Sequence, residues 1–191
     1  MDSSDEIIIE LSKTKIALGI LGSFAFVIAG FWLVTLDADS IRTGSGFRLL
    51  LNSPAVAYGL GFAAIVVFGV LALFFFKKIL NKEPGLIFNS SGIIDNASAA
   101  SAGFIPWSEV LGSQVFEMQG QKMLVIMVAN PQKYVDTGSA LKRKLNQANY
   151  NMVGSPISIS ATTLKTKFPE LCSLFDEYVR KYSSAGEGSR I

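Results

Sequence analysis

The sequence predicts an α+β membrane protein, in which two long apolar helices form a hairpin and a small antiparallel β-domain follows them. Three observations support this class. Half of the 191 residues are hydrophobic and only 17% are charged, whereas soluble domains carry about 25% charged residues. The apolar excess lies in two uncharged blocks within the first 76 residues. The remaining sequence has strand-sized runs between turn residues and ends in an amphipathic helical pattern.

The two uncharged blocks predict membrane-spanning helices at Ile16–Leu36 and Pro54–Phe76. They contain 21 and 23 residues, and at about 1.5 Å per residue each covers the roughly 30 Å of bilayer hydrocarbon. One alternative is a pair of buried core helices in a soluble protein. Two uncharged blocks of this length make that alternative a poor one. The other is a cleaved signal peptide at the first block, which the acidic leader and the length of the block disfavour.

Lysines flank the outer ends of the hairpin, whereas its connecting segment Asp37–Ser53 holds two arginines. The five flanking residues are Lys13, Lys15, Lys77, Lys78 and Lys82. Because basic residues favour the cytoplasmic side, both termini are predicted to lie in the cytoplasm. Small residues recur at helical spacing in both blocks and let helix backbones approach closely in lipid. They predict that the two helices pack on each other, with a partner or a second copy as the alternative.

The segment after the hairpin predicts short antiparallel strands. Turn residues Ser90-Ser91 and Gln119-Gly120-Gln121 separate neighbouring apolar runs, as in tight hairpins. The expected strands are Gly85–Asn89, Gly92–Asn96, Phe104–Trp107, Ser113–Met118, Lys122–Val128 and Pro156–Ser160. The β-branched run at residues 6–11 predicts an extended segment packed near this domain, and entry straight into the first span is the alternative.

Two helical stretches are expected in the same domain. Asn130-Pro131 opens the first, as cap and first-turn residue, and Gly138 is expected to break it into a turn and a longer helix. Tyr134, Leu141, Leu145 and Ala148 can line one face of this stretch. A final helix is expected over Phe168–Tyr182, where Phe168, Leu171, Phe175, Tyr178 and Tyr182 recur at steps of three or four.

Short strands closed by a terminal helix predict a small pleckstrin-homology (PH)-like antiparallel β-barrel or sandwich with a C-terminal amphipathic helix. Several motifs also resemble small bacterial membrane proteins that carry a PH-like domain behind a two-helix hairpin. These motifs are Ser12-Lys13-x-Lys15, Gly22-Ser23-x-x-Phe26-Val27, Pro84-Gly85-Leu86, Gly92-Ile93-Ile94-Asp95-Asn96, Ile105-Pro106-Trp107, and Ala148-Asn149-Tyr150 leading to Pro156-Ile157-Ser158-Ile159. The resemblance covers about residues 10–182, implies a bacterial cytoplasmic (inner) membrane protein and brings no catalytic residues.

Together these features predict six segments along the chain. They are a cytoplasmic N-terminal segment 1–15, helices 16–36 and 54–76 with the external loop 37–53 between them, a cytoplasmic PH-like domain 77–182 and a disordered tail 183–191.

The residue content argues against an enzyme. With no histidine, a histidine triad or imidazole base is excluded, and one cysteine forms neither an internal disulfide nor a cysteine-based zinc site. Cys172 is expected to pack as a small apolar residue. The carboxylates are scattered, and no phosphate loop or dinucleotide fingerprint is present. We therefore expect no catalytic residue, no metal and no cofactor.

Positive charge is the most suggestive feature of the C-terminal part. Residues 77–191 hold 13 basic and nine acidic residues. The candidate contacts for lipid or a partner are Lys77, Lys78, Lys142, Arg143 and Lys144. Lysines at the end of a span anchor it among headgroups. The run 142–144 is interpreted either as a solvated helix face or as a contact with anionic lipid. Nucleic acid is not expected as a partner, because the net charge is small.

The function expected from the sequence is that of a non-catalytic interaction module at the cytoplasmic face of the membrane. It would bind a protein partner or assemble with itself. The alternatives are an anionic-lipid-sensing module and an immunity-like protector against a membrane-targeting toxin.

Overall fold

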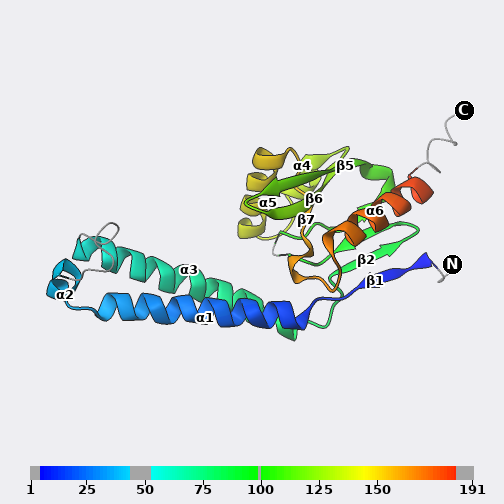
Figure 1. The fold of residues 1–191 in the computed structure, drawn as a ribbon. Coiled ribbons are helices and arrows are strands. Elements are labelled where there is room, and N and C mark those ends of the chain that lie inside the picture. Colours follow the sequence, from blue (N-terminus) through cyan, green and yellow to red (C-terminus); the bar gives the residue numbers. More distant parts are fainter. Residues whose placement is uncertain (1–4, 44–52, 99, 184–191) are drawn as a thin grey trace, which may run out of the picture. The chain divides into compact units, whose positions relative to one another are not determined.

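The computed structural model describes residues 5–43, 53–98 and 100–183 (Figure 1). The chain divides into two compact units. Lys13–Lys82 form the hairpin unit, and Met1–Ser12 join Glu83–Ile191 in the second unit, the β-domain. The hairpin is therefore inserted into the sequence of the β-domain. Most of the expected tail and the central part of the expected external loop lie outside the described residues.

The hairpin unit contains two helices long and apolar enough to span a membrane. They are α1 (Lys13–Thr35) and α3 (Pro54–Leu80), and a short helix α2 (Ala38–Thr43) lies in the connecting segment. Only 17% and 11% of their most apolar windows are buried, so most apolar side chains face outward. Each helix is longer than its predicted uncharged block, because helix-forming lysines extend it at its outer end.

The two long helices pack through small residues, as the sequence predicts. A Cβ added to Gly30 would lie 2.7 Å from the Gly61 carbonyl oxygen, so the backbones approach too closely for any side chain there. Phe26 and Phe68 stack with ring centroids 4.2 Å apart. A Cβ on Gly59, by contrast, would meet nothing within 4 Å. One small-residue face therefore serves the contact between the helices, and Gly59 lies outside it.

The β-domain is built from two antiparallel sheets, which confirms the α+β class. The first sheet contains β1 (Ile7–Ile9), β2 (Leu86–Asn89), β3 (Gly92–Asp95) and β4 (Gly103–Pro106), in that order. The second contains β5 (Val110–Met118), β6 (Gln121–Val128) and β7 (Ser158–Ile159), also in order. Among the described residues no strand pairing joins the two sheets, so a closed barrel is not seen and the PH-like barrel is not confirmed.

Both predicted hairpin turns are confirmed. The Asn89 side-chain oxygen accepts from the Ser91 and Gly92 amides at 2.9 and 3.1 Å, which fixes the turn between β2 and β3. Between β5 and β6, Gln119 and Gly120 have φ angles of 51° and 77°. Two successive positive φ angles are typical of a type I′ turn, whose twist matches that of the flanking strands.

Helices fill the remainder of the domain and begin and end at recognisable caps. They are η2 (Trp107–Glu109), α4 (Pro131–Val135), α5 (Ala140–Val153), η3 (Ala161–Thr163) and α6 (Phe168–Tyr182). The Asn130 side chain caps α4 and the Ser139 hydroxyl caps α5. Gly138 has a φ of 94°, a conformation that side chains other than glycine's rarely adopt, so the predicted break between the two helices is confirmed.

The predicted stripe of α6 forms the centre of the core. Phe175 and Tyr178 pack against Trp107, with ring centroids 6.0 and 5.9 Å away, and Tyr178 also contacts Phe88 at 5.4 Å. The Trp107 indole N–H donates to the Asn89 carbonyl at 2.7 Å, which satisfies its polar atom. The terminal helix therefore joins residues from β2 and η2 in one aromatic cluster.

The N-terminal segment adds a strand to the first sheet, which confirms the expectation that it packs near the domain. Ile9 pairs with Leu86 in the antiparallel ladder of β1 and β2. The Tyr178 hydroxyl donates to the Asp5 carbonyl at 2.7 Å. The Asp5 carboxylate accepts from Lys181 at 2.6 Å and from Tyr182 at 2.5 Å, and these hydrogen bonds lower its pKa. Residues on both sides of the hairpin therefore build one sheet.

The apolar face that the sequence predicts for α5 is not turned toward the core. Tyr134 of α4 is buried, but Leu141, Leu145 and Ala148 are exposed. The buried residues of α5 are Asn146 and Val153. Asn146 is held inside because its side-chain amide donates to the Tyr134 carbonyl at 2.9 Å. A polar face of α5 therefore contacts the domain, and an apolar face is open.

Candidate interaction surfaces

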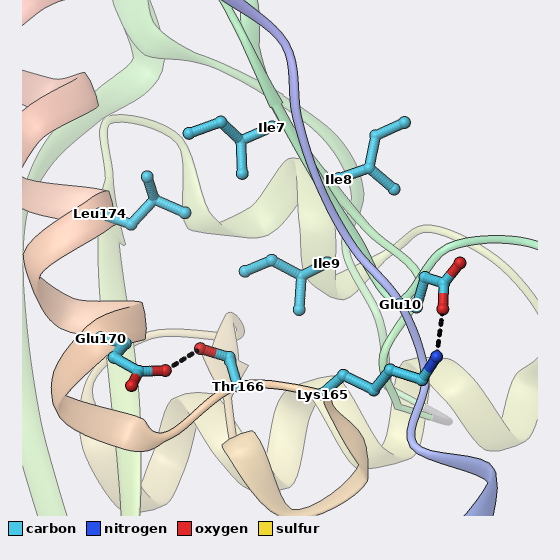
Figure 2. A pocket seen from close by; sticks show the side chains of 8 residues that line it. All are labelled: Ile7, Ile8, Ile9, Glu10, Lys165, Thr166, Glu170 and Leu174. Atoms are coloured by element: carbon cyan, nitrogen blue, oxygen red, sulfur yellow. Dashed lines mark hydrogen bonds and ion pairs between the residues drawn. The ribbon is translucent and has the colours of Figure 1, made fainter.

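A groove of about 490 Å³ lies between the edge strand β1 and helix α6 (Figure 2). Its lining residues are Ile7, Ile8, Ile9, Glu10, Lys165, Thr166, Glu170 and Leu174. Glu10 forms an ion pair with Lys165, and the Thr166 hydroxyl donates to Glu170 at 3.0 Å. These polar groups bond to one another at one end, and the rest of the groove is aliphatic. The arrangement is suited to apolar contact rather than to acid–base chemistry.

Glu109 is the centre of a second polar cluster. Its carboxylate accepts from Lys133 at 2.5 Å and from the Tyr134 hydroxyl at 2.8 Å. These hydrogen bonds lower the pKa of Glu109, whereas burial and the carboxylate raise the pKa of Tyr134 above its usual range. Both groups keep their ordinary protonation states at neutral pH. The cluster fixes α4 to the segment before β5.

Asp95 is a buried carboxylate with a structural role. It is 2% exposed and accepts from the Ala97 and Ala102 amides, both at 2.9 Å. Its two oxygens therefore hold the connection between β3 and β4. Of the residues that the structure describes, no group of three or more Cys, Asp or Glu is placed to hold a metal ion.

Cys172 lies half-buried on α6. Burial, and secondarily Asp176, raise the pKa of its thiol, so the protonated form dominates at neutral pH. A nucleophilic cysteine requires the opposite shift.

β5 is the longest edge strand among the described residues. β5 has nine residues and lies at one end of the second sheet. Val115 is 56% exposed, and Ser113 and Gln114 beside it are also exposed. Natural edge strands are usually short, charged, bulged or covered. β5 has a bulge near Val110 and a charge at Glu117, but Gly112–Phe116 between them carry no such protection.

The predicted basic residues occupy two helices. Lys142, Arg143 and Lys144 lie in the first two turns of α5, and Lys77 and Lys78 lie in the last turn of α3. The first group belongs to the β-domain and the second to the hairpin unit.

Sequence alone does not reveal the edge of β5 or the groove beside β1. The uncharged run Val110–Phe116 is a usable signal for an open edge, but which strand lies at an edge depends on the sheet order. The groove depends on the pairing of β1 with β2, which joins residues far apart in the sequence.

Comparisons with protein-family models, with curated proteins and with solved structures find no match. The resemblance to small bacterial membrane proteins therefore stays a prediction.

Proposed function

We propose that the chain is a non-catalytic, membrane-anchored interaction module whose β-domain binds an extended segment of a protein partner or of a second copy of the chain. The observation that carries the proposal is the open edge of β5, which is uncharged over Gly112–Phe116. An extended segment that pairs with such an edge gains main-chain hydrogen bonds, and alternate side chains of the strand supply specificity. Ser113 and Val115, two residues apart on β5, would provide such contacts on one face of the sheet.

Anchoring in the membrane is supported by the two long apolar helices and by their outward-facing side chains. When both helices cross a bilayer, the pairing of Ile7–Ile9 with Leu86–Phe88 requires both flanks of the hairpin to lie on the same side. The lysines at those flanks favour the cytoplasmic side. A fluorescent protein fused to the C-terminus should therefore fluoresce, and alkaline phosphatase fused there should be inactive. A dark fluorescent protein together with an active phosphatase would contradict this orientation.

A PH-like fold for the β-domain and a bacterial inner-membrane location belong to the same proposal. The separate four-stranded and three-stranded antiparallel sheets and the core position of the terminal helix α6 support a PH-like sandwich. The motifs that resemble small bacterial membrane proteins support the location.

Site-specific photo-crosslinking in native membranes tests the proposed surface. A benzophenone amino acid at Val115 should yield one adduct of defined mass. An adduct at twice the 20.6 kDa of the chain identifies a second copy, and another mass identifies a partner protein. Ser113→Lys should abolish the adduct, because an edge lysine opposes strand addition. Ser173→Lys, at an exposed position of α6, is the matched control and should leave it intact.

Two results would contradict the proposed surface. One is the absence of any protein adduct from Val115 in folded, membrane-inserted chain. The other is an adduct that forms equally when the benzophenone is placed at Ser173, since that position lies on α6 rather than on the edge of β5.

A further inference from the structure

Helix α5 carries an apolar stripe on its outer side. Leu141, Leu145, Ala148 and Met152 are spaced by four, three and four residues, which places them on one face of the helix. Leu141 is 65% exposed, Met152 is 47% exposed, and the other two residues are also exposed. A surface helix of a soluble domain turns such a stripe toward the core, and α5 instead leaves its stripe exposed.

The inward face of α5 is polar and firmly attached. The Asn149 amide donates to the Ser158 hydroxyl at 2.7 Å, and Asn146 is 1% exposed. The side-chain oxygen of Asn146 is buried without a hydrogen-bond partner among the described residues, which is unfavourable. The helix keeps this polar inner face although an apolar stripe is available on an adjacent face. The stripe is therefore arranged for a contact outside the domain.

The charge of α5 has one sign. Lys142, Arg143 and Lys144 lie in its first two turns, and Ala140–Val153 contains no acidic residue. Within residues 5–43, 53–98 and 100–183, no ion pair involves these three side chains. Cations near a helix N-terminus are also disfavoured by the helix dipole. The helix therefore lacks a countercharge of its own, and an anionic surface complements it.

The positions of the three cations differ around the helix axis. At 100° per residue, Lys144 flanks the stripe on its exposed side, and Arg143 points away from the stripe. Lys142 lies on the other side of the stripe, toward the buried Asn146, and is itself half-buried. An apolar stripe between two lysines is typical of a helix that lies in a membrane interface, where lysines extend to the headgroups.

We propose that α5 docks the β-domain flat onto an anionic lipid surface, with its apolar stripe at the boundary between headgroups and acyl chains. This inference rests on the proposed membrane anchoring. Five residues separate α3 from β2, and three separate β1 from α1. At up to about 3.6 Å per residue, these connections keep the domain within roughly 20 Å of the helix ends. Such tethering gives the docking step a high effective concentration, so modest affinity is sufficient.

Lipid quenching of a fluorophore on α5 tests the proposal in the full chain. In a Cys172→Ser background, Ala148→Cys is labelled with an environment-sensitive dye and the chain is placed in nanodiscs that contain spin-labelled lipid. The discs hold phosphatidylcholine alone or equal amounts of phosphatidylcholine and phosphatidylglycerol. Gln147→Cys, an exposed position away from the stripe, provides the matched control label.

We expect quenching at position 148 in discs with phosphatidylglycerol, little quenching at 147, and loss of the difference in high salt. Each flanking lysine should contribute about fivefold to the ratio of docked to undocked domain, so Lys142→Ala with Lys144→Ala should reduce the ratio about 25-fold. Arg143→Ala should change it by less than about twofold. Arg143 and Lys144 are exposed, so their substitution should leave circular dichroism and thermal unfolding unchanged. Lys142 is half-buried, so thermal unfolding of each variant is measured beside the quenching to separate docking from stability.

Three results would overturn the inference. The first is that lipid quenches the label at position 148 no more than the label at position 147. The second is that quenching at 148 changes neither with phosphatidylglycerol nor with the two lysine substitutions. The third is that the label at 148 is protected in cell membranes but in no lipid disc. The last result would assign the stripe to a protein. None of them affects the crosslink at Val115, whereas a chain that leaves the disc would contradict the membrane anchoring itself.

Discussion

Ile9→Ala tests whether a segment that precedes the helical hairpin completes the β-domain. Ile9 is 8% exposed and pairs with Leu86. The substitution removes three carbon groups, and at about 0.8 kcal/mol per buried group the transfer loss is about 2.4 kcal/mol. The cavity left behind raises the expected loss of unfolding free energy to about 3 kcal/mol. Ile8→Ala is the matched control: Ile8 is 52% exposed, so its loss should be about 1 kcal/mol.

The assay is urea unfolding of the full chain in detergent micelles, followed by tryptophan fluorescence. Trp32 of α1 is replaced by Phe so that Trp107, which is 3% exposed, reports on the β-domain alone. The Ile9→Ala midpoint should shift to lower urea by more than twice the shift of Ile8→Ala, with unchanged slope. Equal shifts for the two variants would refute the reasoning, because β1 would then contribute no buried side chain to the domain.

Three further predictions follow from single contacts. Gly30→Val should destabilise the contact between α1 and α3 by about 1–3 kcal/mol, measured as loss of energy transfer between dyes on the two helices; Gly22→Val, where a Cβ meets nothing within 4 Å, should have no effect. Asp95→Asn should reduce domain stability by about 1–3 kcal/mol, because an amide N–H₂ would oppose one of two backbone N–H donors; an unchanged urea midpoint would contradict this. Glu109→Gln should be destabilising at neutral pH, because hydrogen bonds from Lys133 and Tyr134 lower the pKa of Glu109 below its usual 4.5. A lowered pKa gives stability that is present above pH 4.5 and is lost as the pH falls through the pKa of Glu109 in the folded protein. The difference in urea midpoint between wild type and Glu109→Gln should therefore vanish in acid. A difference that stays constant across this pH range would contradict the prediction.

Local sequence signals predicted those elements whose contacts are local. The bounds of α6 coincide with the predicted Phe168–Tyr182, because its stripe at steps of three or four meets one continuous core. The turn at Gln119-Gly120 was equally readable, since glycine supplies a positive φ angle. The long helices were predicted by length and composition alone.

The inner face of α5 could not be predicted in the same way. Hydrophobic periodicity assumes that the apolar side of a helix faces the core, and α5 violates this assumption. Its inner face is selected by hydrogen bonds from Asn146 to the Tyr134 carbonyl and from Asn149 to Ser158. Those partners come from α4 and β7, so only the tertiary structure shows the preference. The lysines of α5 were identified from sequence, but their position beside an exposed apolar stripe was not.

The two sheets depend on pairings between distant segments. β1 is separated from β2 by the whole hairpin unit, and no local pattern specifies that pairing. The order of the second sheet likewise decides that β5 rather than β6 has an open edge. The candidate surfaces on β1 and β5 therefore follow from topology, whereas the basic run on α5 follows from composition.

Native mass spectrometry of the chain, extracted from its own membranes together with surrounding lipid, tests the proposed interaction module most directly. A module that binds through the edge of β5 should carry one stoichiometric polypeptide in addition to its own 20.6 kDa. That mass should be lost with Ser113→Lys and retained with Ser173→Lys. A wild-type chain that carries only lipid, like both variants, would contradict the proposed interaction module.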